Sequence, residues 1–198
     1  MIVRNQLKYA QDRLFKGKAL LVFGPRQSGK STFIAQLLAQ NKNKKALILN
    51  GDDEDTVELL SKPNSTKLKG IIGKHKILYI DEAQRIKDIG IVIKIIVDQI
   101  KTVQVIATGS SAFELANKTN EPLTGRKYEM LLLPFSYGEL VQEFGFLEEK
   151  RNLEQRLVYG SYPEIVTNPA DAAEHIKLLA NSYLYKDLFL LEQIAKPV

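Results

Sequence analysis

The sequence contains no cysteine among its 198 residues. This absence excludes disulfide bonds and thiolate metal sites, and it is typical of proteins in a reducing cytosol. The N-terminus carries no apolar signal-peptide core. The most apolar stretch, residues 89–100, is interrupted by Lys94 and Asp98 and is too short to cross a bilayer. We therefore expect a cytoplasmic protein that makes no membrane contact.

Repeats, low-complexity linkers and a strong charge imbalance are also lacking. The net charge is +5 and the sequence pI is about 9.2, a mild excess that only weakly indicates a nucleic-acid partner. Basic residues gather at 42–45 and 67–76, which we interpret as solvated surface, with an anionic partner left open. His75 and His175 are far apart and are interpreted as surface or core residues. The length and the 44% hydrophobic content suit one domain with an appendage.

Residues 24–31 read Gly-Pro-Arg-Gln-Ser-Gly-Lys-Ser, the phosphate-binding pattern G-x-x-x-x-G-K-[ST]. An apolar run of strand length precedes this loop at 19–23, and a helical apolar pattern follows at 32–39. That context favours a phosphate loop over a glycine-rich turn before an ordinary helix. Loop N–H groups and the helix N-terminus would face phosphate oxygens. The predicted nucleotide-binding residues are Gly24, Pro25, Arg26, Gln27, Ser28, Gly29, Lys30, Ser31 and Thr32.

Within this set, Lys30 is expected to reach the β- and γ-phosphates and Ser31 to bind Mg²⁺. Arg26 is expected to contact either the nucleotide or its own backbone. A second motif, Ile-Leu-Tyr-Ile-Asp-Glu at 77–82, is typical of a Walker B strand. Asp81 is then predicted to bind Mg²⁺, and Glu82 to act as the general base toward water. The alternative is a strand followed by an acidic helix cap.

Two hydroxyl residues follow the next apolar run, at 103–107. In P-loop NTPases of this strand order, the end of that strand carries a polar group that senses the γ-phosphate. Thr108 and Ser110 fit that place, and their hydroxyls would hold the attacking water or a phosphate oxygen. They equally suit the cap of a helix expected at 111–116.

The chain alternates apolar strand runs with helical patterns, which predicts a parallel sheet covered on both faces. Strands are expected at 19–23, 46–50, 77–82, 103–107 and 128–133. Helices are expected at 4–16, 32–39, from 52, at 86–100 and from 170 towards 190. We therefore predict an α/β P-loop NTPase three-layer sandwich with a C-terminal helical extension. Its domains would be 1–145, including an N-terminal helix, and 146–198. The four acids at 52–55 are interpreted as a helix start rather than a metal site.

Further motifs follow in order: Ala-Thr-Gly-Ser-Ser, Leu-Thr-Gly-Arg, Leu-Leu-Pro-Phe-Ser-Tyr-Gly-Glu-Leu, Gly-Ser-Tyr-Pro-Glu and Tyr-Leu-Tyr-Lys-Asp. With the first two motifs, they resemble the prokaryotic AAA-domain ATPases that carry a C-terminal domain of unknown function. The resemblance covers nearly the whole chain. It implies that the chain is the N-terminal ATPase part of a longer protein. AAA-type ATPases often carry an arginine finger near Arg126 that serves a neighbouring subunit. An ion-paired arginine beside a turn is the alternative for Arg126.

The leading functional hypothesis is a Mg²⁺-dependent ATPase that couples hydrolysis to a conformational change. ATP is favoured over GTP because no strand ends in an Asn-Lys-x-Asp guanine-binding motif; residues 117–120 are only a near match. A homo-oligomer or another partner would supply the arginine finger. The alternatives are the ATPase part of a nucleic-acid machine and a slow nucleotide-gated switch. A small-molecule kinase is disfavoured because no arginine-rich lid is evident.

Overall fold

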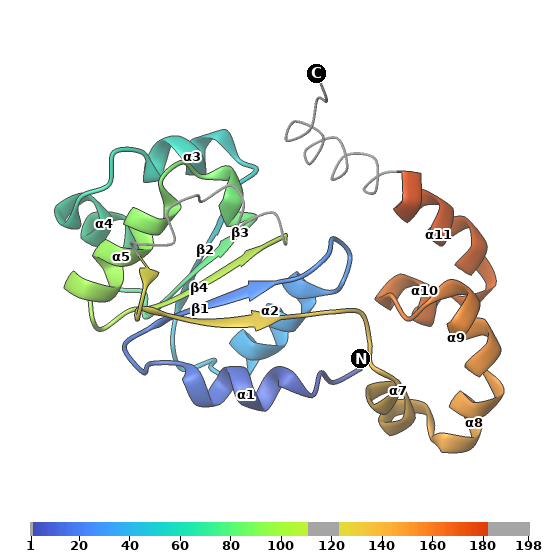
Figure 1. Cartoon of the computed structure of the whole chain (residues 1–198). Helices are drawn as coiled ribbons and strands as arrows, with labels where there is room; N and C mark the ends of the chain where they lie inside the picture. The colour runs from blue at the N-terminus through green and yellow to red at the C-terminus, as the bar shows by residue number, and fades with distance from the viewer. Residues whose placement is uncertain (1, 111–122, 182–198) are drawn as a thin grey trace. The chain divides into compact units, whose positions relative to one another are not determined.

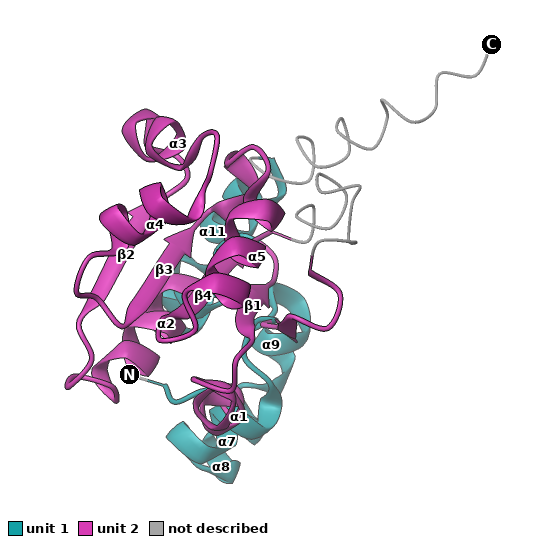
Figure 2. Ribbon diagram, turned by 90° about the vertical axis from the view of Figure 1, so that its left-hand side faces the viewer, with its two compact units in different colours: residues 1–4, 26–29, 133–198 teal, residues 5–25, 30–132 magenta. Residues whose placement is uncertain are grey.

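The computed structural model describes residues 2–110 and 123–181, and these form two compact units (Figure 2). The sheet unit comprises residues 5–25, 30–110 and 123–132. The helical unit comprises residues 2–4, 26–29 and 133–181. Within the described residues, no helix is long and apolar enough to span a membrane.

The sheet unit is built on five parallel strands in the order β2-β3-β4-β1-β5 (Figure 1). Their bounds are β1 Ala19–Phe23, β2 Ala46–Asn50, β3 Ile77–Asp81, β4 Gln104–Gly109 and β5 Lys127–Leu131. The central strands β1 and β4 are buried along their whole length, which explains why both are mainly apolar runs. Because all the strands run in one direction, their carboxyl ends meet at one edge of the sheet.

Helices cover both faces of this sheet (Figure 1). Leu20 and Val22 point to the face covered by α1 and α2, whereas Leu21 and Phe23 point to the face covered by α3, α4 and α5. This alternation follows from the two-residue period of a strand. The bounds are α1 Gln6–Arg13, α2 Lys30–Ala39, α3 Glu54–Leu60, α4 Ser65–Ile72, the 3₁₀ turn η1 Ala83–Arg85 and α5 Ile89–Gln99. The predicted three-layer α/β class is thus confirmed.

The helical unit has a small apolar core of its own. Ile2, Leu140 and Val166 are buried together, and Phe135 packs against them. Ser136 and Glu139 form a reciprocal capping box at the start of α7. The helices are α7 Tyr137–Phe144, α8 Phe146–Arg151, α9 Leu153–Tyr159, α10 Pro163–Thr167, η3 Pro169–Asp171 and α11 Ala172–Leu179.

Several element boundaries differ from the sequence prediction. Helix α5 begins at Ile89 rather than 86, because η1 and a left-handed Asp88 come first. Helix α4 was not predicted, because it is short, contains a glycine and buries only Leu68 and Ile72. The acids at 52–55 lie at the start of α3, and Asp53 occupies the N-cap position without a side-chain capping bond. No cluster of three or more potential metal-ligating side chains occurs in the described part of the chain. The helix expected at 111–116 lies outside the described residues.

Candidate functional site

The carboxyl edge of the sheet gathers most of the residues that the sequence motifs single out. Strand β1 ends at Phe23, β3 at Asp81 and β4 at Gly109, and β4 lies between the other two strands. Ligands of open parallel sheets bind in the crevice outside this edge. The phosphate-binding pattern begins directly after β1, and α2 begins at its lysine.

Lys30 is held inside the loop that follows β1. Its Nζ donates hydrogen bonds to the carbonyl oxygens of Gly24 (3.0 Å) and Pro25 (2.9 Å), and the residue is only 6% exposed. The loop backbone turns through left-handed conformations at Gln27 and Gly29, with φ of 59° and 89°. The lysine ammonium group therefore lies against the carbonyl groups at the start of the loop, and it is the charge that a phosphate would meet.

Hydroxyl side chains from two elements converge on the carboxylate of Asp81, at the end of β3. Ser31 Oγ, in the first turn of α2, donates to Asp81 Oδ2 at 3.0 Å. Thr108 Oγ1, on β4, donates to Asp81 Oδ1. The carboxylate and the Ser31 hydroxyl are hard oxygen ligands that lie together next to the phosphate-binding pattern. This donor set fits Mg²⁺, which favours one or two protein oxygens alongside phosphate and water.

Glu82 follows directly and has an unusual backbone. Its φ of 46° and ψ of 42° are left-handed, its N–H donates to Asp81 Oδ1 at 3.1 Å, and its carboxylate accepts a hydrogen bond from Gln84 Nε2. Gly51, just after β2, donates its N–H to the Asp81 carbonyl at 2.8 Å. A Cβ atom on Gly51 would overlap the carbonyl oxygen of Glu82. The neighbouring strand therefore fixes the backbone that carries the two acids.

Tyr79 belongs to the same group, and motif reasoning did not identify it. It lies on β3 two residues before Asp81, so both side chains point to the α1 and α2 face. Its hydroxyl is 3.3 Å from Thr108 Oγ1, and the residue is 5% exposed. Burial raises the pKa of Tyr79, so the phenol keeps its proton at neutral pH. The sequence did offer one signal for Tyr79, a hydroxyl-bearing aromatic residue two positions before the predicted magnesium ligand Asp81.

We expect Tyr79→Phe to lower the free energy of unfolding by about 1 kcal/mol at neutral pH, through loss of one buried hydrogen bond. Above pH 10, where an unfolded tyrosine ionises, the wild type should lose stability. The folded state disfavours the tyrosinate, so this loss continues as pH rises through the folded pKa. Phenylalanine does not titrate, so the difference in unfolding free energy between the wild type and Tyr79→Phe should shrink as pH rises above 10.

Urea unfolding at pH 7.5 and pH 10.5 measures this difference. Tyr128→Phe, on the half-buried strand β5, is the matched control for loss of one tyrosine hydroxyl. An unfolding difference for Tyr79→Phe that stays constant between the two pH values would contradict the expectation.

Ser110 also lies at the carboxyl edge, buried directly after β4. Thr32 is the third residue of α2 and is exposed. Residues 26–29 of the loop belong to the helical unit; Ser28 is buried there and Gln27 is exposed. These positions agree with a loop that presents its backbone rather than its side chains.

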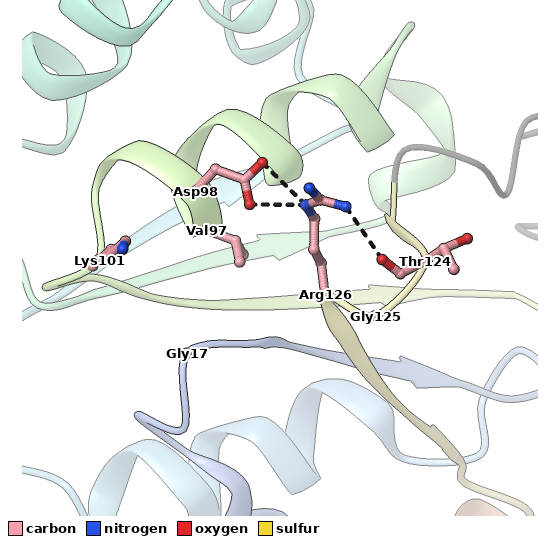
Figure 3. Close-up of a pocket in the computed structure, with 7 residues that line it drawn as sticks. All are labelled: Gly17, Val97, Asp98, Lys101, Thr124, Gly125 and Arg126. Atoms are coloured by element: carbon pink, nitrogen blue, oxygen red, sulfur yellow. Dashed lines mark hydrogen bonds and ion pairs between the residues drawn. The ribbon is translucent and has the colours of Figure 1, made fainter.

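Arg126 is not brought to this edge. It precedes β5, and its carbonyl accepts a hydrogen bond from the N–H of Ala19 at the start of β1, so it lies at the amino edge of the sheet. Its Nε donates to both carboxylate oxygens of Asp98, at 2.8 and 3.0 Å, beside a shallow surface hollow (Figure 3). Its Nη1 donates to the Thr124 carbonyl at 3.2 Å. Arg126 is therefore ion-paired with Asp98, as the alternative interpretation expects. Its role as an arginine finger for a neighbouring subunit stays a prediction.

A family model described as an AAA domain matches residues 16–141. The uncharacterized protein MJ1544 of Methanocaldococcus jannaschii is 23% identical over 191 residues, which cover 89% of this chain and 43% of that protein. The chain thus spans less than half the length of this curated relative.

Two solved structures share the fold. The Walker-type ATPase paby2304 of Pyrococcus abyssi aligns with a TM-score of 0.59 and 16% identity, over 98% of this chain and 77% of that one. The Pif1 helicase from Candida albicans aligns with a TM-score of 0.50 and 14% identity, over 77% of this chain and 44% of that one. At these identities the likeness shows the fold alone.

Proposed function

Because the chain belongs to the AAA domain family, we propose that it binds ATP with Mg²⁺, hydrolyses it and couples hydrolysis to a conformational change. The observation that carries the proposal is the convergence of Ser31 and Thr108 on the Asp81 carboxylate. These groups come from α2, β4 and β3, and all lie at the edge where the phosphate-binding pattern begins. An ordinary helix cap after β3 would not require a hydroxyl group from each neighbouring element.

Each residue has a distinct role in the proposal. Lys30 exchanges its bonds to loop carbonyls for bonds to the β- and γ-phosphates. Ser31 and Asp81 would hold Mg²⁺, which when bound neutralises charge on the phosphate oxygens. Glu82 orients a water molecule and takes its proton. Thr108 and Ser110 hold the attacking water or a γ-phosphate oxygen.

The direct test is phosphate release from ATP by the wild-type chain, with Mg²⁺ and with EDTA, beside GTP. We expect turnover that requires Mg²⁺ and prefers ATP. Tight ATP binding without turnover would favour the slow nucleotide-gated switch instead. Absence of ATP binding would overturn the proposal.

A nucleic-acid machine is the second candidate. The observation that favours it is the fold shared with a Pif1 helicase, together with the mildly basic chain. Turnover in the presence of single-stranded DNA tests it. A several-fold stimulation by DNA would support this candidate, and unchanged turnover would remove it.

The proposal for Arg126 requires a second subunit. Its guanidinium lies at the amino edge of its own sheet, so a role in phosphoryl transfer requires a neighbouring subunit's nucleotide. We infer that such a homo-oligomer or partner would raise turnover, because an arginine finger stabilises charge on the γ-phosphate. Turnover per chain should then rise with protein concentration.

A further inference from the structure

Arg4, near the N-terminus, is a buried cation in the helical unit. It is 5% exposed, and its guanidinium carbon lies 4.6 Å from the ring centroid of Phe135. Its Nη1 is 3.5 Å from Glu139 Oε2, and its Nη2 donates to the Leu133 carbonyl. Burial lowers the pKa of Arg4, and the Glu139 carboxylate opposes that shift. Phe135, Glu139 and Leu133 therefore hold the guanidinium plane.

Glu139 anchors this arrangement to helix α7. The same carboxylate oxygen accepts hydrogen bonds from the Ser136 N–H at 2.8 Å and the Ser136 hydroxyl at 3.2 Å. Glu139 is 4% exposed, so two charges are removed from water together. Among the described residues, Arg4 Nε is buried without a hydrogen-bond partner. A buried pair of this kind contributes little net stability, which favours a role in positioning.

The other face of Arg4 meets the phosphate loop. Its Nη2 also lies 3.5 Å from the carbonyl oxygen of Ser28. Next to it, a Cβ atom on Gly29 would lie 3.4 Å from Cγ of Pro163, the first residue of α10. Arg4 thus approaches Ser28, and Pro163 lies beside the next residue of the loop, Gly29.

These two contacts belong to one connected structure. The Phe135 N–H donates to the Ser161 carbonyl at 2.9 Å, and the Ser161 hydroxyl donates back to the Phe135 carbonyl at 2.5 Å. Phe135 stacks on Arg4, and Ser161 lies two residues before Pro163. The sequence motifs at 132–140 and 160–164 have no role in the proposed ATP hydrolysis. Through Phe135 and Ser161, they support the two residues that lie next to the phosphate loop, Arg4 and Pro163.

We propose that Arg4 is a positioning residue that aims the Gly29 N–H at nucleotide phosphate by holding the Ser28 carbonyl. The carbonyl and N–H of one trans peptide point in opposite directions, so anchoring the oxygen fixes the N–H. Gly29 has a φ of 89°, which glycine adopts as readily as a negative φ, so the glycine alone does not fix the direction of this peptide. This inference rests on the proposed nucleotide binding. It also gives the residues at the starts of α7 and α10 a role, because they hold Arg4 and Pro163 beside the Ser28–Gly29 peptide.

The test compares Arg4→Lys with Arg156→Lys. Arg156 forms another largely buried arginine–glutamate pair in the described part of this unit, 2.9 Å from Glu149 Oε1, between α9 and α8. Lysine keeps the charge but cannot donate to several fixed acceptors at once. Affinity for Mg²⁺-ADP is measured by calorimetry, so the result does not depend on turnover, and thermal unfolding is measured beside it.

We expect both variants to unfold at a lower temperature, but only Arg4→Lys to bind more weakly. Its Kd should rise roughly tenfold, equivalent to about 1.4 kcal/mol. Pro163→Ala is a second, milder variant and should raise Kd a few-fold. If Arg4→Lys does not fold, the nucleotide affinity of Pro163→Ala tests the inference instead.

Wild-type affinity in Arg4→Lys, or equal weakening in Arg156→Lys, overturns the positioning role while the proposed function stands. If the wild type binds no nucleotide, the proposed function fails, and the inference fails with it.

Discussion

Replacing Lys30 with methionine is expected to abolish measurable ATP turnover and to weaken nucleotide binding about 10- to 100-fold. Hydrogen bonds to charged groups contribute about 1.5–3 kcal/mol, and the ammonium group is the charge inside the loop. The buried side chain of Lys30 packs at the start of α2, so methionine keeps most of its volume. The variant should therefore remain folded and lose only nucleotide binding and turnover.

Calorimetry with Mg²⁺-ATP and a phosphate-release assay measure the two effects of Lys30→Met. Lys74→Met is the matched control, because Lys74 is exposed in the turn before β3, at the amino edge of the sheet. It should behave as the wild type. Retained affinity in Lys30→Met would show that the loop is a structural turn and not a phosphate site.

Glu82→Gln is expected to separate binding from hydrolysis. A general base contributes about 10²- to 10⁴-fold to rate, so turnover should fall by that factor while ATP affinity stays within a few-fold of wild type. Glutamine retains an oxygen that can accept the bond from Gln84 Nε2, so the left-handed backbone at position 82 keeps its surroundings.

Single-turnover hydrolysis and equilibrium ATP binding, measured on the same preparation, show whether Glu82 is a general base or a helix cap. Glu58→Gln, an exposed acid on α3, serves as the control for loss of one negative charge. If Glu82→Gln hydrolyses ATP at the wild-type rate and only unfolds more easily, the acid is a helix cap.

The strands could be predicted because each is a short apolar run of strand length bounded by turn signals. Residues 19–23 match β1 residue for residue, and β1 is buried along its whole length. Residues 46–50 match β2 equally well, although β2 is an edge strand that is only partly buried. The convergence of Ser31 and Asp81 could also be anticipated. Carboxyl ends of parallel strands meet at one edge, and each residue lies at the end of a strand or the start of the following helix.

The remaining features depend on partners far along the chain. Arg4 contacts Glu139, 135 positions away, and no local pattern marks either residue as part of a pair. Tyr79 fits an apolar strand, and only the register of β3 beside β4 shows that its hydroxyl meets Thr108. The position of Arg126 at the amino edge, by contrast, follows from the sequence, because Arg126 directly precedes the parallel strand β5.

Gly51 has a consequence for how mutational data on this protein would be interpreted. Any side chain at position 51 must displace the Glu82 carbonyl, and Arg85 Cβ, 3.3 Å from the same point, leaves no room to adjust. The backbone shift would displace Glu82, the proposed general base, while the loop after β1 stayed in place. A deep mutational scan scored on turnover would therefore rank position 51 among the catalytic residues, and one scored on nucleotide affinity would rank it as neutral.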